Sequence, residues 1–196
     1  MGFSHYWRRE QEIAQSTMES IVNDFRKIVK AISPYVDLAG GLGEGKPEIT
    51  YDRICFNGNA KCGHPREDLG ITWPSDDAGG IAEPFKENVQ KGNWSAGSQL
   101  QKRTCGGNCS HETMSFPRIM KLQSWSKPKN GLYFKFCKTA FKPYDLAVIS
   151  LLIIAKYYLK EKIKVSSNGT EEQWFDGKFI CQQVLGYGLD FKLSED

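Results

Sequence analysis

The sequence predicts an α+β fold: a mainly antiparallel sheet with one βαβ crossover, a long N-terminal helix and a loop-rich insertion. Three observations support this prediction. The first segment has helical periodicity, alternating patterns typical of strands flank a stretch rich in Gly, Asn and Ser, and the C-terminal third alternates strand and helix patterns. With 196 residues, 40% of them hydrophobic, the chain is expected to form one domain over 1–196 that contains the insertion at 58–110.

The N-terminal segment is predicted to be one amphipathic helix over 6–33. Apolar residues recur there at helical spacing among charged ones, and Pro34 ends the pattern. A Gly-rich loop at 39–47 then leads to a strand over 48–59, which stops at an Asn-Gly pair.

After the insertion, regular patterns return. A strand at 111–122 is expected to pair antiparallel with the strand before the insertion, which would place the insertion at the tip of a long hairpin. The final helix begins with a Thr-Glu-Glu-Gln sequence typical of a capping box, and Gly186 ends it. The remaining elements are a strand at 130–139, a helix at 143–160, a strand at 162–169 and this final helix at 170–185.

The loop GGLGEGKP, at 40–47, resembles a phosphate-binding P-loop without its context. A P-loop follows a strand, precedes a helix and carries Ser or Thr after its lysine. Here a helix precedes the loop, a strand follows it, and Pro47 stands in the Ser/Thr position. We therefore interpret it as a flexible connection.

Cysteine and histidine cluster around the insertion. Cys62-Gly-His64 and Cys109-Ser-His111 repeat a C-x-H pattern, and Cys105 lies four residues before Cys109. Thiolate and imidazole groups are the usual zinc ligands, and a bound metal would explain how a loop-rich segment stays folded. These five residues are the predicted metal ligands. A disulfide from Cys62 to Cys105 or Cys109, or free thiols, remain as alternatives.

A second candidate site lies where the segment CKTAFKPYD, at 137–145, joins a strand to a helix. The N-terminus of a helix favours anions, and the crossover would bring the segment KVSSNG alongside as a parallel strand. His111 and Glu112 could face the same rim. The predicted ligand-binding residues are Lys138, Thr139, Lys142, Tyr144, Ser166, Ser167 and Asn168. Alternatively, Asp145 only caps the helix, the lysines are solvated and Ser-Ser-Asn-Gly is an ordinary turn.

Composition narrows the possible partners and location. A net charge of +3 is too weak to predict nucleic-acid binding. The most apolar run, 146–155, is about half a membrane span, and no targeting segment is evident, so we expect a soluble cytoplasmic protein. No G-x-S-x-G or H-E-x-x-H motif is present, so the sequence leaves open whether the protein is an enzyme. It also leaves open whether the protein forms oligomers.

The segments LYFKFCKTAFKPYD, KVSSNG and LGYG, within 130–188, resemble a family of small uncharacterised proteins from prokaryotic and phage genomes. The resemblance implies a prokaryotic or phage setting, with the host cytoplasm as the location, but no activity. The expected function is binding of a small anionic ligand, a nucleotide or phosphate-bearing metabolite. A phage setting would make sequestration of a host signalling nucleotide one use. The alternative is a non-catalytic phage structural or host-interaction protein with a zinc-stabilised insertion.

Overall fold

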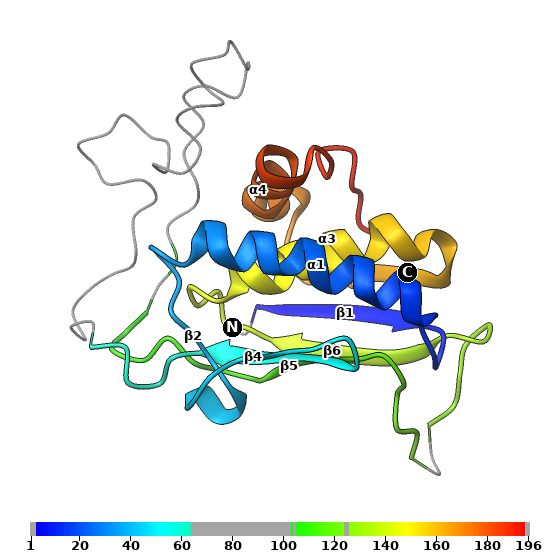
Figure 1. Ribbon diagram of the computed structural model, residues 1–196, viewed down its shortest axis with the longest axis horizontal. Helices are drawn as coiled ribbons and strands as arrows, with labels where there is room; N and C mark the ends of the chain where they lie inside the picture. Colours follow the sequence, from blue (N-terminus) through cyan, green and yellow to red (C-terminus); the bar gives the residue numbers. More distant parts are fainter. Residues whose placement is uncertain (1–2, 64–102, 104, 124–125, 195–196) are drawn as a thin grey trace.

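The computed structural model describes residues 3–63, 103, 105–123 and 126–194. It confirms the predicted α+β class: antiparallel sheets form one layer, α1 and α3 cover one face of it, and α4 packs on the far side of these helices (Figure 1). Most of the predicted insertion, 64–102, lies outside the described residues.

The elements follow one another in an order close to the predicted one. The helices are α1 (Gln15–Ile32), α3 (Asp145–Leu159) and α4 (Phe175–Leu185), with short 3₁₀ turns at Gly41–Gly43, Lys160–Lys162 and Glu171–Trp174. The strands are β1 (Ser4–Arg9), β2 (Leu38–Ala39), β3 (Glu48–Ile49), β4 (Arg53–Gly58), β5 (Met114–Pro117), β6 (Tyr133–Lys138) and β7 (Ile163–Ser167).

The predicted helix over 6–33 is wrong in its N-terminal third. Residues 4–9 form strand β1, and the helix begins only at Gln15. In β1 the side chains of His5, Trp7 and Arg9 are buried, whereas Tyr6 and Arg8 are partly exposed, which is the two-residue period of a strand. Because two of the three buried positions hold His and Arg, hydropathy does not show this alternation.

Strand β1 is the centre of the first sheet, whose order is β6-β1-β7. It pairs antiparallel with β6, from Ser4↔Lys138 to Arg9↔Tyr133, and antiparallel with β7 on its other edge. Strands β6 and β7 therefore run parallel, joined by α3 as the predicted βαβ crossover. We expected β6 and β7 to be direct neighbours, but β1, which the sequence did not predict, lies between them.

The second sheet is built on β4, which pairs antiparallel with β2, β3 and β5. The register between β4 and β5 runs from Arg53↔Pro117 to Phe56↔Met114, so the segments that flank the insertion pair as predicted. The two sheets meet where the Arg9 guanidinium donates to the Pro117 carbonyl oxygen and lies 4.9 Å above the Phe116 ring.

The helices bury the inner face of the sheets. Helix α3 is apolar around its whole circumference, and all residues from Leu146 to Ala155 are buried because α1, α4 and the sheet surround it. The final helical segment has the predicted capping box between Thr170 and Gln173, and Gly186 ends it in the left-handed conformation.

Candidate metal centre

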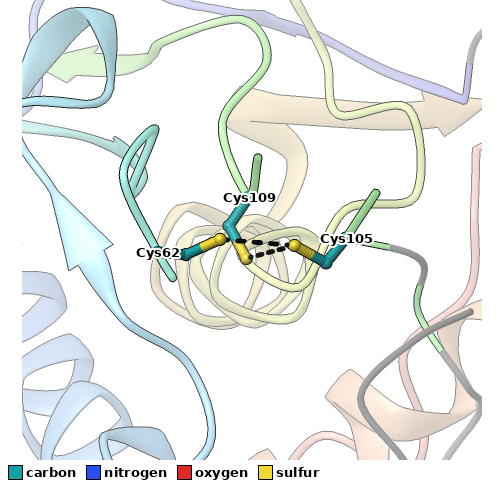
Figure 2. A group of neighbouring side chains, drawn as sticks. All are labelled: Cys62, Cys105 and Cys109. Carbon is teal, nitrogen blue, oxygen red and sulfur yellow. Dashed lines mark hydrogen bonds between the residues drawn. The ribbon is translucent and has the colours of Figure 1, made fainter. Parts of the chain in front are cut away.

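Three cysteines meet at the base of the insertion. Cys62 follows β4, and Cys105 and Cys109 precede β5, so the group joins the two ends of the segment 64–102. Figure 2 shows their side chains converging: the Sγ atom of Cys105 lies 3.4 Å from that of Cys62 and 3.3 Å from that of Cys109. All three Sγ atoms lie within 4.8 Å of one another.

The turn from Cys105 to Cys109 depends on its backbone conformation and on one lysine. Gly106 has a positive φ of 64°, which a side-chain-bearing residue rarely adopts, and this allows the tight reversal between the two cysteines. The Lys142 ammonium donates hydrogen bonds to the carbonyl oxygens of Cys105 and Asn108. These contacts tie the turn to the segment before α3.

The turn also packs closely on the end of β4. A Cβ atom added at Gly58 would lie only 2.0 Å from the Cys109 carbonyl oxygen, so only glycine fits there. The Cys109 amide donates to the Asn59 carbonyl oxygen at 3.1 Å. Two segments more than 40 residues apart in sequence are thus held together by backbone contacts as well as by the thiols.

The thiols lie in a poorly solvated environment. Cys105 and Cys109 are buried, and Cys62 is partly buried. Burial is the largest cause that raises the pKa of Cys105 and of Cys109, and hydrogen bonding of the Cys109 thiol to the neighbouring sulfur atoms raises the pKa of Cys109 further. Without a metal the two groups are therefore neutral thiols at physiological pH, which are poor nucleophiles.

The structure accounts for three of the five predicted metal ligands. Cys62, Cys105 and Cys109 form a group that could bind a metal ion. Within the described part of the chain, His111 does not belong to this group, and its Nδ1 atom lies 3.0 Å from the Lys138 carbonyl oxygen. His64 lies outside the described residues. In the structure none of these three cysteines forms a disulfide, and neither does Cys55, Cys137 or Cys181.

The residues predicted to bind an anion gather at one end of the first sheet, where β1 lies between them. The amide of Thr139 donates to the Phe3 carbonyl oxygen, and Asn168 Oδ1 accepts a hydrogen bond from the Ser4 amide at 2.8 Å. The Ser167 hydroxyl lies 3.1 Å from the Ser4 carbonyl oxygen. The crevice expected between two parallel strands is therefore filled by the chain itself.

The other members of that predicted set have different environments. Lys142 holds the cysteine turn, and the buried Tyr144 hydroxyl donates to the Glu112 carbonyl oxygen at 2.7 Å. Lys138 is exposed, and Ser166 lies on the side of the sheet opposite the helices. As predicted, His111 and Glu112 lie at this rim, and a Glu112 carboxylate oxygen accepts a hydrogen bond from the Lys138 amide at 2.6 Å. Binding of a small anion here stays a prediction.

A buried network that the sequence did not predict lies beneath this rim. The Asp145 carboxylate contacts His5 Nε2 at 2.7 Å and Arg103 at 3.4 Å, and it accepts a hydrogen bond from the Thr139 hydroxyl. Arg103 also pairs with Asp176. Burial alone would raise the pKa of Asp145, but the facing His5 and Arg103 and the Thr139 hydroxyl hold it below its usual range. These residues are scattered along the sequence, so no motif marks them.

The Ser167 hydroxyl lies 3.1 Å from His5 Nδ1, which completes the order hydroxyl, imidazole, carboxylate found in nucleophilic catalysis. However, His5 is fully buried, and its ring packs edge-on against those of Phe3 and Trp174 at 4.9 Å each. A substrate has no open side from which to reach the imidazole. We interpret the arrangement as structural.

Comparison of the chain with protein-family models, with curated proteins and with solved structures finds no match. The resemblance to prokaryotic and phage proteins therefore stays a prediction. Among the helices of the described segments, none is both long enough and apolar enough to cross a membrane.

Proposed function

We propose that this protein binds one Zn²⁺ ion through Cys62, Cys105 and Cys109, and that the metal fixes the base of the insertion to the core. The observation that carries the proposal is the convergence of three thiols from both sides of the insertion within 4.8 Å. Structural zinc sites in proteins are closed by four Cys or His ligands, and these three cysteines would supply all but one of them.

The spacing of the sulfur atoms suits a metal. In a tetrahedral site with Zn–S bonds of about 2.3 Å, two thiolate sulfurs stand about 3.8 Å apart. The observed separations of 3.4 and 3.3 Å need to grow by only about half an ångström, which small side-chain rotations supply. A disulfide between any two of them would leave the third thiol without a role.

The local charges also favour a metal. Binding of Zn²⁺ displaces the protons of the thiols, and three thiolates with one Zn²⁺ carry a net charge of −1. The Lys142 ammonium, bonded to two carbonyl oxygens of the turn, is positioned to offset that charge. A metal thus turns buried neutral thiols into a charge-balanced cluster.

The proposed role of the metal is structural. A metal ion bound by these cysteines would join Cys62, which follows β4, directly to Cys105 and Cys109, which precede β5. Consistent with this, the pKa values of Cys105 and Cys109 are raised rather than lowered, which is unlike a reactive, redox-active cysteine.

Elemental analysis of the purified full-length chain tests the proposal. Wild-type protein should contain about one zinc per chain, and Cys105→Ser and Cys109→Ser should lose it. Cys55→Ser is the matched control, because Cys55 is also buried but lies in β4 outside the group. His111→Ala should keep its zinc, since its imidazole is not part of the group.

Replacement by Co²⁺ adds a spectroscopic test, because thiolate ligands give Co²⁺ an intense charge-transfer absorption. Wild-type protein should show this band, and Cys105→Ser should lose it. Wild-type protein that stays metal-free after purification with added zinc, or a Cys105→Ser variant with wild-type metal content, would refute the proposal.

A further inference from the structure

The face of the first sheet opposite the helices carries aromatic and cationic side chains in register. We call it the outer face and define it by Tyr6, Arg8, Phe134, Phe136, Lys138, Lys164 and Ser166. The pairing places Tyr6 between Phe136 and Ser166 in one row, and Arg8 between Phe134 and Lys164 in the next. Three strands therefore contribute to one continuous surface.

The aromatic rings on this surface are near-parallel; two of them are exposed and that of Tyr6 is partly exposed. Phe134 and Phe136 are each 44% exposed, although phenylalanine is among the residues most often buried. The Phe134 ring centroid lies 6.0 Å from that of Tyr6 and 6.0 Å from that of Phe136, with interplanar angles of 19° and 30°. The rings form a strip on which flat groups can stack.

Cations accompany the rings. The Arg8 guanidinium lies 5.0 Å from the Phe134 centroid, and the Lys138 ammonium lies 5.8 Å from that of Phe136. A cavity of about 220 Å³ adjoins the strip, and its lining contains the cations Arg8, Lys129 and Lys164 but no acidic side chain. None of these three cations forms a salt bridge with another described residue.

We propose that the outer face binds single-stranded nucleic acid, with bases stacked on Tyr6, Phe134 and Phe136 and phosphates held by Arg8, Lys138 and Lys164. Exposed aromatics on a sheet surface interleaved with Lys and Arg are the arrangement by which proteins bind single strands. An apolar protein partner would leave the three cations of the cavity without an oppositely charged group, since no acidic side chain lines it. A duplex keeps its bases stacked on one another and cannot use the rings.

This inference is independent of the proposed zinc site, and it gives a use to two residues from the predicted anion-binding set, Lys138 and Ser166. The anion in question is a phosphodiester rather than a small metabolite. A net charge of +3 is compatible with it, because the relevant charge is local to one face.

Fluorescence anisotropy with labelled 12-nucleotide oligo(U) and oligo(dT) in about 50 mM salt tests the proposal, since phosphate contacts are strongest at low salt. Wild-type protein should bind at least one of the two saturably and should bind a duplex of the same length more weakly. Phe134→Ala and Phe136→Ala should each weaken binding about 5- to 150-fold, the effect of removing the ring under one stacked base.

Two controls separate stacking from general effects. Phe134→Leu keeps an apolar side chain without a π-face and should bind as weakly as Phe134→Ala, whereas Phe134→Trp should retain binding. Tyr157→Ala removes another exposed ring that also lies under a cation, Lys160 at 4.3 Å, but on α3. This variant should bind like wild type.

The salt dependence gives an independent readout. The logarithm of the binding constant decreases linearly with the logarithm of the salt concentration, and this slope should become shallower by about 0.7 in Arg8→Ala and in Lys164→Ala. Each variant contacts one phosphate fewer than wild type. Absence of saturable binding to both oligonucleotides, equal affinity for the duplex, or wild-type affinity in the Phe134→Ala, Phe136→Ala double variant would each overturn the proposal. So would a dimer that this double variant abolishes without any oligonucleotide binding, because the face would then serve self-association.

Discussion

Replacement of Asp145 by asparagine tests the buried network directly. The substitution keeps the shape of the side chain but removes the charge that faces His5 and Arg103, all three fully buried. Removing one partner of a buried ion pair costs about 3–5 kcal/mol, because the remaining charge is left in a poorly solvated site. For a chain of this size, 1 kcal/mol shifts Tm by about 2–4 °C. We therefore expect Asp145→Asn to lower Tm by about 6–20 °C at pH 7.

Thermal unfolding followed by circular dichroism measures this loss, and its pH dependence tests the cause. The pKa of Asp145 in the folded protein lies below its ordinary value. The carboxylate therefore contributes its stability above the unfolded pKa of about 3.9, and this contribution disappears as the pH falls through the folded pKa. The gap in Tm between wild type and Asp145→Asn should thus narrow below about pH 4.

Glu161→Gln is the control for removal of an acidic charge as such. The Glu161 side chain is 94% exposed and lies 3.7 Å from Lys156, so its loss should leave Tm within about 1 °C of wild type. An Asp145→Asn variant with wild-type Tm at pH 7 would refute the reasoning, as would a gap in Tm that stays constant into the acid range.

Three further predictions concern the site and its supports. Gly58→Ala forces a methyl group against the Cys109 carbonyl oxygen and should lower Tm by several degrees. Gly41→Ala is the control, because a methyl group there meets nothing within 4 Å and should leave Tm unchanged. Equal Tm values for the two variants in a melting experiment would contradict this prediction. Tyr144→Phe removes the hydrogen bond to Glu112 and should cost about 1 kcal/mol in urea unfolding, and a loss near zero would mean that the carbonyl finds another donor. Chelation of zinc should lower the Tm of wild-type protein but leave that of the Cys105→Ser variant unchanged, and equal shifts in both would show that the chelator acts elsewhere.

Much of the fold could be predicted because its signals are local. Helix α3 is a continuous apolar run, and α4 carries its capping box and its terminal glycine in the sequence itself. Strand β1 was missed because its inward positions hold His5 and Arg9, whose burial depends on partners far away in the sequence. Tertiary pairing overrode the local pattern there.

The two sites differ in the same way, because one is marked by local spacing in the sequence and the other depends on tertiary pairing. The spacing of cysteines around the insertion was enough to predict the three that converge, but not that His111 would bond to Lys138 instead. The outer face was not predictable from composition, because it depends on register: Phe134, Arg8 and Lys164 become neighbours only when β1 lies between β6 and β7.

The central position of β1 has a consequence for how the chain folds during synthesis. Ser4 pairs with Lys138 and His5 with Ser167, so β1 leaves the ribosome long before either partner strand exists. Its edge toward β6 stays unpaired until residue 138 has been translated, and its edge toward β7 until residue 167, and such long-range pairing makes assembly slow. In the meantime the chain exposes a segment containing Tyr6 and Trp7 next to an amphipathic helix. Strand β1 therefore waits longer for its first partner than β4, whose partner β5 begins at Met114.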